Sequence, residues 1–167
     1  PYPASVPDST SLVFLPGIVS GNGLDFNACF SPKGDAFYFS RSNGGQWDIY
    51  ETINNGKKWS KPTLAAFSER YSEADPTFAP DGRLFFISNR PTQANPNKSD
   101  YDIWFIRPLE SGGWSQPENL TEVNSDSSEY YISFSENGNL YFGSSRPGGF
   151  GAEDIYISHL PKGKYTT

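Results

Sequence analysis

The stretch from Glu73 to Leu120 decides the fold. It reads EADPTFAPDG (73–82), RLFFISNR (83–90), then a loop to YDIWFI (101–106), and GGWSQPENL (112–120). It contains four short apolar runs, each bounded by turn residues, and no run is long enough for a helix. This pattern predicts four antiparallel β-strands that follow one another in chain order.

The same pattern occurs once before this stretch and once after it. Four landmarks recur in the same order at a spacing of about fifty residues. They close the first strand (Phe30, Phe78, Phe134), end the second (Arg41, Arg90, Arg146), open the third (Asp48, Asp102, Asp154) and open the fourth (Trp59, Trp114, Tyr165). Four strands per repeat at this period are typical of β-propeller blades. We therefore predict an all-β chain built of four-stranded antiparallel blades.

The repeat divides a single domain, 1–167, into three blades. An outer strand at 11–19 precedes blade one (24–68), blade two (73–125) and blade three (128–167), which has no outer strand of its own. The expected strands lie near 12–16, 25–31, 36–41, 48–53, 60–67, 73–79, 84–89, 102–107, 115–122, 129–135, 139–145 and 154–159. Each glycine of the first hairpin turn, Gly34, Gly82 and Gly138, is expected to supply a positive φ.

Three blades are half of a six-bladed ring, and propellers use about four to eight. We therefore expect a homodimer of two chains, closed by two equivalent junctions. At each junction Leu12–Leu15 completes the third blade of the partner.

Composition excludes several classes of protein. The 167 residues carry a formal charge of −6 with scattered basic residues, so there is no nucleic-acid footprint. No apolar run reaches the roughly eighteen residues that span a membrane. Cys29 is the only cysteine, which leaves no intrachain disulfide and no cysteine zinc site, and a small buried side chain is expected there. The chain begins at Pro1 without an apolar leader, so either a signal peptide has been removed or the chain has been trimmed.

Two strings carry a resemblance to a known family. They are FAPDGRLFFISNRP (78–91) and SSRPGGFGAEDIY (144–156). With the turn, the Ser-x-Arg and the Asp-Ile-aromatic triplet in register, the chain resembles the WD40-like repeats of TolB-type bacterial β-propellers over Leu12–Tyr165. The resemblance implies radially packed blades, a six-bladed ring, and a periplasmic or secreted protein.

The first strands supply the candidate binding residues. Each copy has an acid five residues before the landmark phenylalanine (Asp25, Glu73, Glu129), and a second position two residues after that acid (Asn27, Asp75, Tyr131). In a propeller these residues line one mouth of the central channel, where the three acids could hold a cation such as calcium. In the alternative, each acid pairs with the recurrent arginine, Arg41, Arg90 or Arg146. Because structure repeats while sites usually break symmetry, repetition in every copy favours the ion pairs.

The remaining repeated residues are interpreted as structural. Asp48, Asp102 and Asp154 are expected to accept hydrogen bonds from loop N–H groups, and Trp59, Trp114 and Tyr165 to cover neighbouring strands. The loops between second and third strands differ most, with a longer one at 91–100, which is typical of binding loops. Phe150 in the last of these loops is either an exposed contact or a plug between blades, and the plug is favoured.

Catalysis finds little support in the sequence. His159 is the only histidine, and no nucleophile elbow or phosphate loop occurs. We expect a non-catalytic propeller that binds a protein or glycan partner and needs no cofactor. The alternatives are a polysaccharide-active enzyme, the accessory propeller of one, or a fragment of a longer six-bladed propeller.

Overall fold

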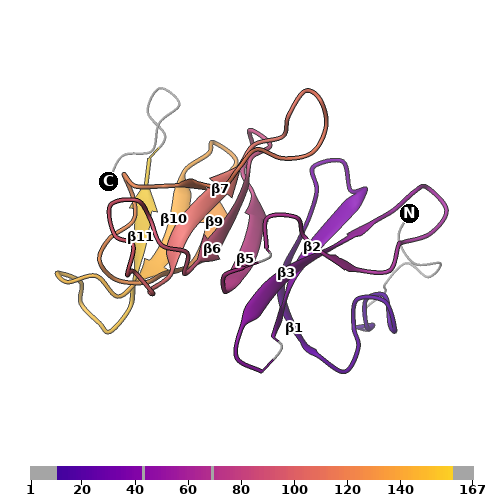
Figure 1. Cartoon of the computed structure of the whole chain (residues 1–167), viewed down its shortest axis with the longest axis horizontal. Helices are drawn as coiled ribbons and strands as arrows, with labels where there is room; N and C mark the ends of the chain where they lie inside the picture. The colour runs from indigo at the N-terminus through magenta and orange to yellow at the C-terminus, as the bar shows by residue number, and fades with distance from the viewer. Residues whose placement is uncertain (1–10, 43, 69, 160–167) are drawn as a thin grey trace.

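The chain folds into three antiparallel β-sheets. The computed structural model describes residues 11–42, 44–68 and 70–159, and within them every regular element is a strand. The sheets follow one another along the chain and stand next to one another in space, from indigo to yellow in Figure 1. The predicted all-β class and the division into three sheets are confirmed.

Each sheet has the strand order of the chain. The first consists of β1 (Leu24–Phe30), β2 (Ala36–Ser42), β3 (Trp47–Ile53) and β4 (Thr63–Leu64); the second of β5 (Glu73–Phe78), β6 (Leu84–Ser88), β7 (Asp102–Ile106) and β8 (Glu118–Asn119); the third of β9 (Glu129–Phe134), β10 (Leu140–Ser144) and β11 (Asp154–Ser158). Eleven of the twelve expected strands are therefore present in the part of the chain that the structure describes.

The first hairpin of every sheet has the same turn. In each turn a glycine N–H donates to a carbonyl three residues earlier, Gly34 to Ser31, Gly82 to Ala79 and Gly138 to Ser135, at 2.8–2.9 Å. The φ angles of these glycines are +69°, +87° and +86°. The predicted role of glycine is confirmed, because side-chain-bearing residues rarely adopt this conformation.

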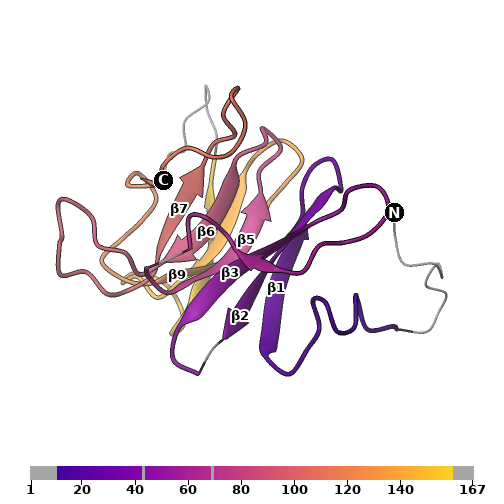
Figure 2. The same cartoon turned by 45° about the vertical axis from the view of Figure 1, so that its right-hand side comes forward.

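The sheets pack face to face, and the second is covered on both sides. Its first strand, β5, contacts β1, β2 and β3, while β9 contacts β5, β6 and β7. Figure 1 shows the second sheet between the other two, and Figure 2 shows β5 beside the strands of the first sheet. Every residue of β6 and β7 is buried. The sheets on either side of the second sheet therefore account for the apolar side chains on both faces of β6 and β7.

The outer faces of the first and third sheets differ in how far they are covered. The free face of the first sheet carries Phe37 and Phe39, and the segment before β1 covers it with Phe14, Leu15 and Val19. On the third sheet, two residues of β11 lie on the face that no described residue covers. Ile155 is 84% exposed and Ile157 is 43% exposed.

The repeat shows that this exposure is exceptional. Ile49 and Ile103, which occupy the position of Ile155 in the first two sheets, are 0% exposed. In those sheets the next sheet provides the cover. The third sheet thus presents a face of the kind that is buried elsewhere in the molecule.

The N-terminal strand expected at 12–16 does not form, and this prediction is wrong for the single chain. Residues 15–20 make a tight turn in which the Val19 N–H donates to the Leu15 carbonyl at 2.9 Å. Only an isolated bridge joins Pro16 to Ser20. A strand needs a partner edge, and no third strand of a preceding sheet lies beside this segment in the described chain.

The outer strands are also shorter than expected. Instead of 60–67 and 115–122, ladder pairing covers only β4 and β8, with single bridges at Asn54–Trp59 and Pro108–Trp114. Pro62 and Pro117 lie directly before these strands, and proline has no N–H to donate to a ladder. Tyr165, the third copy's equivalent of Trp59 and Trp114, lies outside the described residues.

Two of the three repeated aromatics occupy equivalent places. Trp59 and Trp114 each form the first bridge of the outer strand, as predicted. Trp114 is half-buried and packs its ring against Tyr38 and Phe78, at centroid distances of 6.5 and 6.1 Å. It therefore joins the second sheet to the first.

Replacing Trp114 with alanine should lower the free energy of unfolding by about 2 kcal/mol, less than the roughly 3–5 kcal/mol of a fully buried aromatic, because part of its ring meets solvent. Urea unfolding followed by circular dichroism measures this loss.

The matched control is Phe150→Ala. Phe150 is fully exposed in the single chain and plugs no gap between its sheets, so its truncation should change stability by less than about 0.5 kcal/mol. Equal losses for both variants would contradict this assignment of Trp114.

Candidate functional site

The acids that begin the first strands are bound by arginines. Asp25 pairs with Arg41 at 2.6 Å and Glu129 with Arg146 at 3.0 Å, and Glu73 pairs with Arg90. Glu73 and Glu129 are completely buried. The ion-pair alternative thus describes all three copies.

Each arginine also holds the preceding part of the chain. Arg41 donates to the carbonyl of Val19, Arg90 to that of Phe67 and Arg146 to that of Val123, at 2.8–2.9 Å. These carbonyls lie in the turns that precede each sheet. The guanidinium groups also lie over aromatic rings of the second and third strands, as Arg90 does over Trp104 at 5.1 Å. We call each acid, its arginine and the contacted carbonyl a clamp.

Glu73 is an acid buried beside its arginine. Burial raises the pKa of this carboxyl above its ordinary value, while the Arg90 charge and the hydrogen bond from Ser88 at 3.1 Å oppose that rise. The carboxylate is therefore acceptable in the interior only because Arg90 is beside it.

The alternative to these ion pairs, a ring of Asp25, Glu73 and Glu129 that could hold calcium, is not formed by the described residues. Among the described residues no three carboxylate, histidine or cysteine side chains are close enough together to hold a metal ion. Each carboxylate turns toward its own arginine instead, because a guanidinium within the same sheet satisfies it at short range.

Replacing Arg90 with methionine should cost about 3–5 kcal/mol of unfolding free energy at pH 8, because Glu73 would be left as an uncompensated buried charge. Without Arg90 the folded-state pKa of Glu73 rises further above its unfolded value of about 4.5. The penalty is therefore present above the folded pKa and relieved as the pH falls through it.

Urea unfolding of both proteins at pH 8 and pH 5 tests this, and the deficit of the variant should shrink at pH 5. The double variant Arg90→Met/Glu73→Leu is the control, since it removes the charge and should recover most of the loss at pH 8. A deficit that does not depend on pH would contradict the clamp.

The aspartates that open the third strands stabilise the loops before them. Asp154 accepts hydrogen bonds from the N–H groups of Phe150 and Gly151, at 2.8 and 3.1 Å, as predicted. A Cβ atom at Gly149 would collide with this carboxylate, which accounts for that glycine. Asp48 accepts from the side chain of Gln46 at 3.2 Å.

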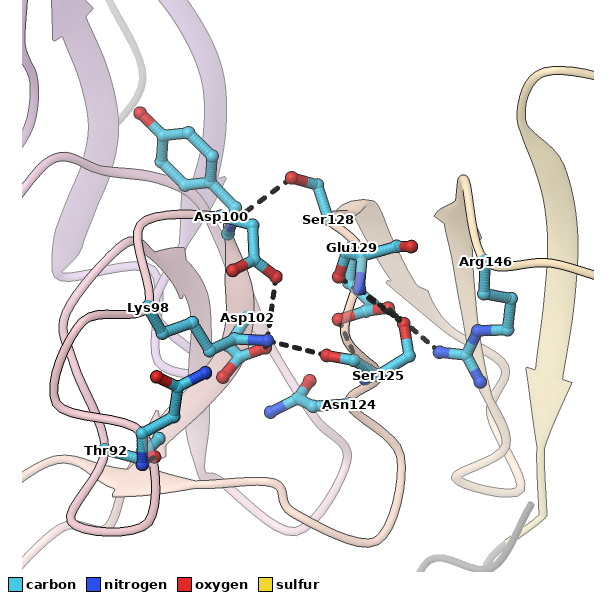
Figure 3. A network of polar contacts seen from close by, with 12 residues as sticks. Thr92, Lys98, Asp100, Asp102, Asn124, Ser125, Ser128, Glu129 and Arg146 are labelled. Carbon is cyan, nitrogen blue, oxygen red and sulfur yellow. Dashed lines mark hydrogen bonds and ion pairs between the residues drawn. The ribbon is translucent and has the colours of Figure 1, made fainter.

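In the longer loop of the second sheet, at 91–100, the Lys98 side chain is buried against neighbouring acids. Lys98 forms ion pairs with Asp100 at 2.7 Å and Asp102 at 3.1 Å, and donates to the Ser125 carbonyl at 2.6 Å (Figure 3). Burial alone would lower the pKa of Lys98, but its hydrogen bonds to the two aspartates outweigh this and raise it. Lys98 thus stabilises the loop rather than offering a charge to a ligand.

The second set of first-strand residues lies at a bulge in each sheet. Asn27, Asp75 and Tyr131 have φ angles of +40°, +57° and +55°, and the strand pairing shifts register at each of them. Asparagine and aspartate tolerate this left-handed conformation, whereas for tyrosine it is strained. Backbone strain of this kind is concentrated at functional sites.

The structure brings these three residues together. The Asp75 carboxylate accepts hydrogen bonds from the Asn27 side-chain amide and from the Tyr131 backbone N–H, the latter at 2.9 Å. The Asp75 N–H donates to Ser40 at 3.1 Å. One carboxylate, 6% exposed as a residue, therefore joins all three sheets, while Tyr131 is 68% exposed.

Hollows lie on both sides of this junction. One of about 290 Å³ is lined by Ala28, Thr77 and Ile132 together with the three bulge residues. The other, of about 370 Å³, is the aromatic pocket, and it is lined by Phe26, Trp47, Tyr130 and Tyr131, with Asp75 and Glu153.

The rings of the aromatic pocket support one another. Phe26 meets Trp47 edge-on at 5.8 Å, Trp47 stacks on Tyr101 at 5.1 Å, and Tyr101 lies 5.8 Å from Tyr130. The Tyr101 hydroxyl donates to Ser72 at 2.7 Å, which holds this supporting ring in place. Aromatic walls with a few fixed polar groups are typical of binding sites.

Sequence reasoning found the bulge residues of this pocket and missed its walls. Trp47 and Tyr101 directly precede Asp48 and Asp102 in the first two copies, and Phe26 and Tyr130 directly precede Asn27 and Tyr131. An aromatic residue next to a repeated landmark was the available signal.

Neither a protein-family model nor a curated protein sequence matches the chain. Within the described residues, no helix has the length and apolar character needed to cross a membrane.

Proposed function

We propose that the three sheets are blades of a β-propeller of the TolB type. The arrangement of the first strands supports this: β5 contacts both β1 and β9, so the three lie side by side, and no contact joins the short outer strands β4 and β8. Sheets that fan out from neighbouring first strands are the geometry of propeller blades.

We further propose that a second copy of the chain closes the ring at six blades. The exposed face of the third sheet, with Ile155 and Ile157, would pack against the partner's first sheet on the side that the segment before β1 covers. Patches of this kind are association sites.

The turn at residues 15–20 supports this closure. It has the hydrogen bonds of the turns that end the first and second sheets, Ser68 to Ala65 and Val123 to Leu120, and Arg41 clamps it as the other arginines clamp those turns. The segment before β1 therefore takes the place of a preceding outer strand. In the closed ring that strand would belong to the third blade of the partner.

Ile155→Asp should abolish this association, because the charge would be buried at the junction. Light scattering should give about twice 18.5 kDa for the wild-type chain and 18.5 kDa for the variant. Leu109→Asp, at an exposed leucine in the turn after β7, is the matched control and should remain a dimer. A wild-type chain that stays monomeric would rule out the closure.

The function we propose is binding of a protein or glycan partner at the aromatic pocket, without catalysis. A single observation carries it: Tyr131 is held in a strained conformation at the edge of the pocket and exposes most of its ring to solvent. A strained, exposed tyrosine contributes little to stability, so a role in recognition explains it best. The setting implied by the resemblance, the periplasm or the cell exterior, is part of the same proposal.

Tyr131→Gly separates recognition from structure. Glycine relieves the left-handed strain, so the unfolding free energy should stay equal or rise by up to about 1 kcal/mol. Binding to the partner found in a screen of glycans and peptides should weaken at least about tenfold, through loss of the ring. Calorimetry of unfolding and of binding measures the two effects.

Phe150→Ala is the control, since it removes a fully exposed aromatic ring that does not line the pocket and should leave binding unchanged. Tyr131→Gly with unchanged binding would contradict the proposed site. Hydrolysis or cleavage of a glycan in the same screen would favour a polysaccharide-active enzyme instead.

A further inference from the structure

The charge of the aromatic pocket is unbalanced. Asp75 and Glu153 contribute carboxylates to its lining, and no lysine or arginine lines it. Glu153 is exposed at its edge, while Asp75 is almost entirely buried at its base. The pocket therefore has a negative base and aromatic walls.

Asp75 differs from the other buried acids of the described chain. Glu73, Glu129 and Asp102 are each paired with an arginine or a lysine. Among the described residues, the Asp75 carboxylate accepts hydrogen bonds only from neutral donors, the side-chain amide of Asn27 and the backbone N–H of Tyr131. A buried carboxylate is costly without an opposite charge, and a bound cation would supply it.

The walls suit an organic cation. Ammonium and guanidinium groups are attracted to the faces of tryptophan and tyrosine rings within about 6 Å. The chain itself repeatedly uses this contact, for example with Arg146 lying 4.8 Å from the Tyr156 ring centre and Arg41 lying 5.0 Å from that of Tyr50. The pocket offers similar rings, Trp47 and Tyr130, beside a carboxylate but contains no cation of its own.

We propose that the aromatic pocket binds a basic side chain, arginine or lysine, of a partner protein. This inference rests on the proposed binding function and names the chemistry of its ligand. The exposed Tyr131 ring at the edge would contact the partner around the inserted side chain, as aromatic residues do at the centres of interfaces. The net charge of −6 would favour the approach of a basic partner.

The test uses the full chain and three capped amino acids. N-acetyl-arginine amide and N-acetyl-lysine amide carry the charge, whereas N-acetyl-citrulline amide has nearly the shape of the arginine probe without it. Amide NMR titration should show the two cations binding with resonance shifts at Trp47, Tyr130 and Tyr131. Citrulline should bind at least about tenfold more weakly, a difference that corresponds to about 1.4 kcal/mol.

Variants locate the effect. Asp75→Asn keeps the size and tolerates the left-handed backbone, and should weaken arginine binding about tenfold while leaving citrulline unchanged. Glu153→Gln, at an exposed position where folding is not at risk, should weaken it about two- to threefold. Glu122→Gln removes an exposed charge outside the pocket and should have no effect.

The outcomes separate this inference from the proposed function. Equal affinity for arginine and citrulline, or arginine binding that survives both pocket variants, would overturn the inference. A neutral glycan that binds at Tyr131 would overturn it too, but would leave the proposed function standing. If no glycan or peptide bound in the screen and no capped amino acid bound in the titration, the inference and the proposed function would both be wrong.

Discussion

The pairing of a buried acid with an arginine at the end of the second strand is the constraint on which the rest of the structure depends. Arg90 joins four parts of the protein at once: the first strand through Glu73, its own strand through the Ser88 hydroxyl, the preceding turn through the Phe67 carbonyl, and the rings beneath it. Hydrogen bonds between strands hold the strands of one sheet together but do not link that sheet to the preceding part of the chain. The clamp also fixes the sheet to what precedes it, so three sheets acquire a single spatial order.

The clamp and the bulge hold the molecule together in different ways. Glu73 and its arginine secure the start of the first strand, while Asp75, two positions later, joins the sheets through Asn27 and Tyr131. The three copies place different side chains there, Asn27, Asp75 and Tyr131, although the backbone conformation is the same. The backbone geometry thus repeats in the three sheets while the side chains differ, so the group that these positions form is asymmetric.

The fold could be predicted well from the sequence wherever it depends on neighbouring residues alone. Turn glycines and apolar runs fix each hairpin from neighbouring residues alone, so strands such as β6 and β7 were found within two residues of their bounds. The strand at 12–16 failed because its partner edge is absent from the chain around it, which no local pattern reveals. The outer strands are shorter than expected because Pro62 and Pro117 have no N–H to donate to the ladder.

The site was harder to predict for a physical reason. Whether an acid is a ligand or a structural partner depends on the charge that lies nearest in space, and for Asp25 this is Arg41, sixteen residues away in sequence. The converse holds for Asp75, whose neighbours in the fold come from the first and third sheets and carry no positive charge. An acid left without a cation by its own chain is thus a better sign of a binding site than an acid that merely repeats. The pocket around Asp75 meets that criterion.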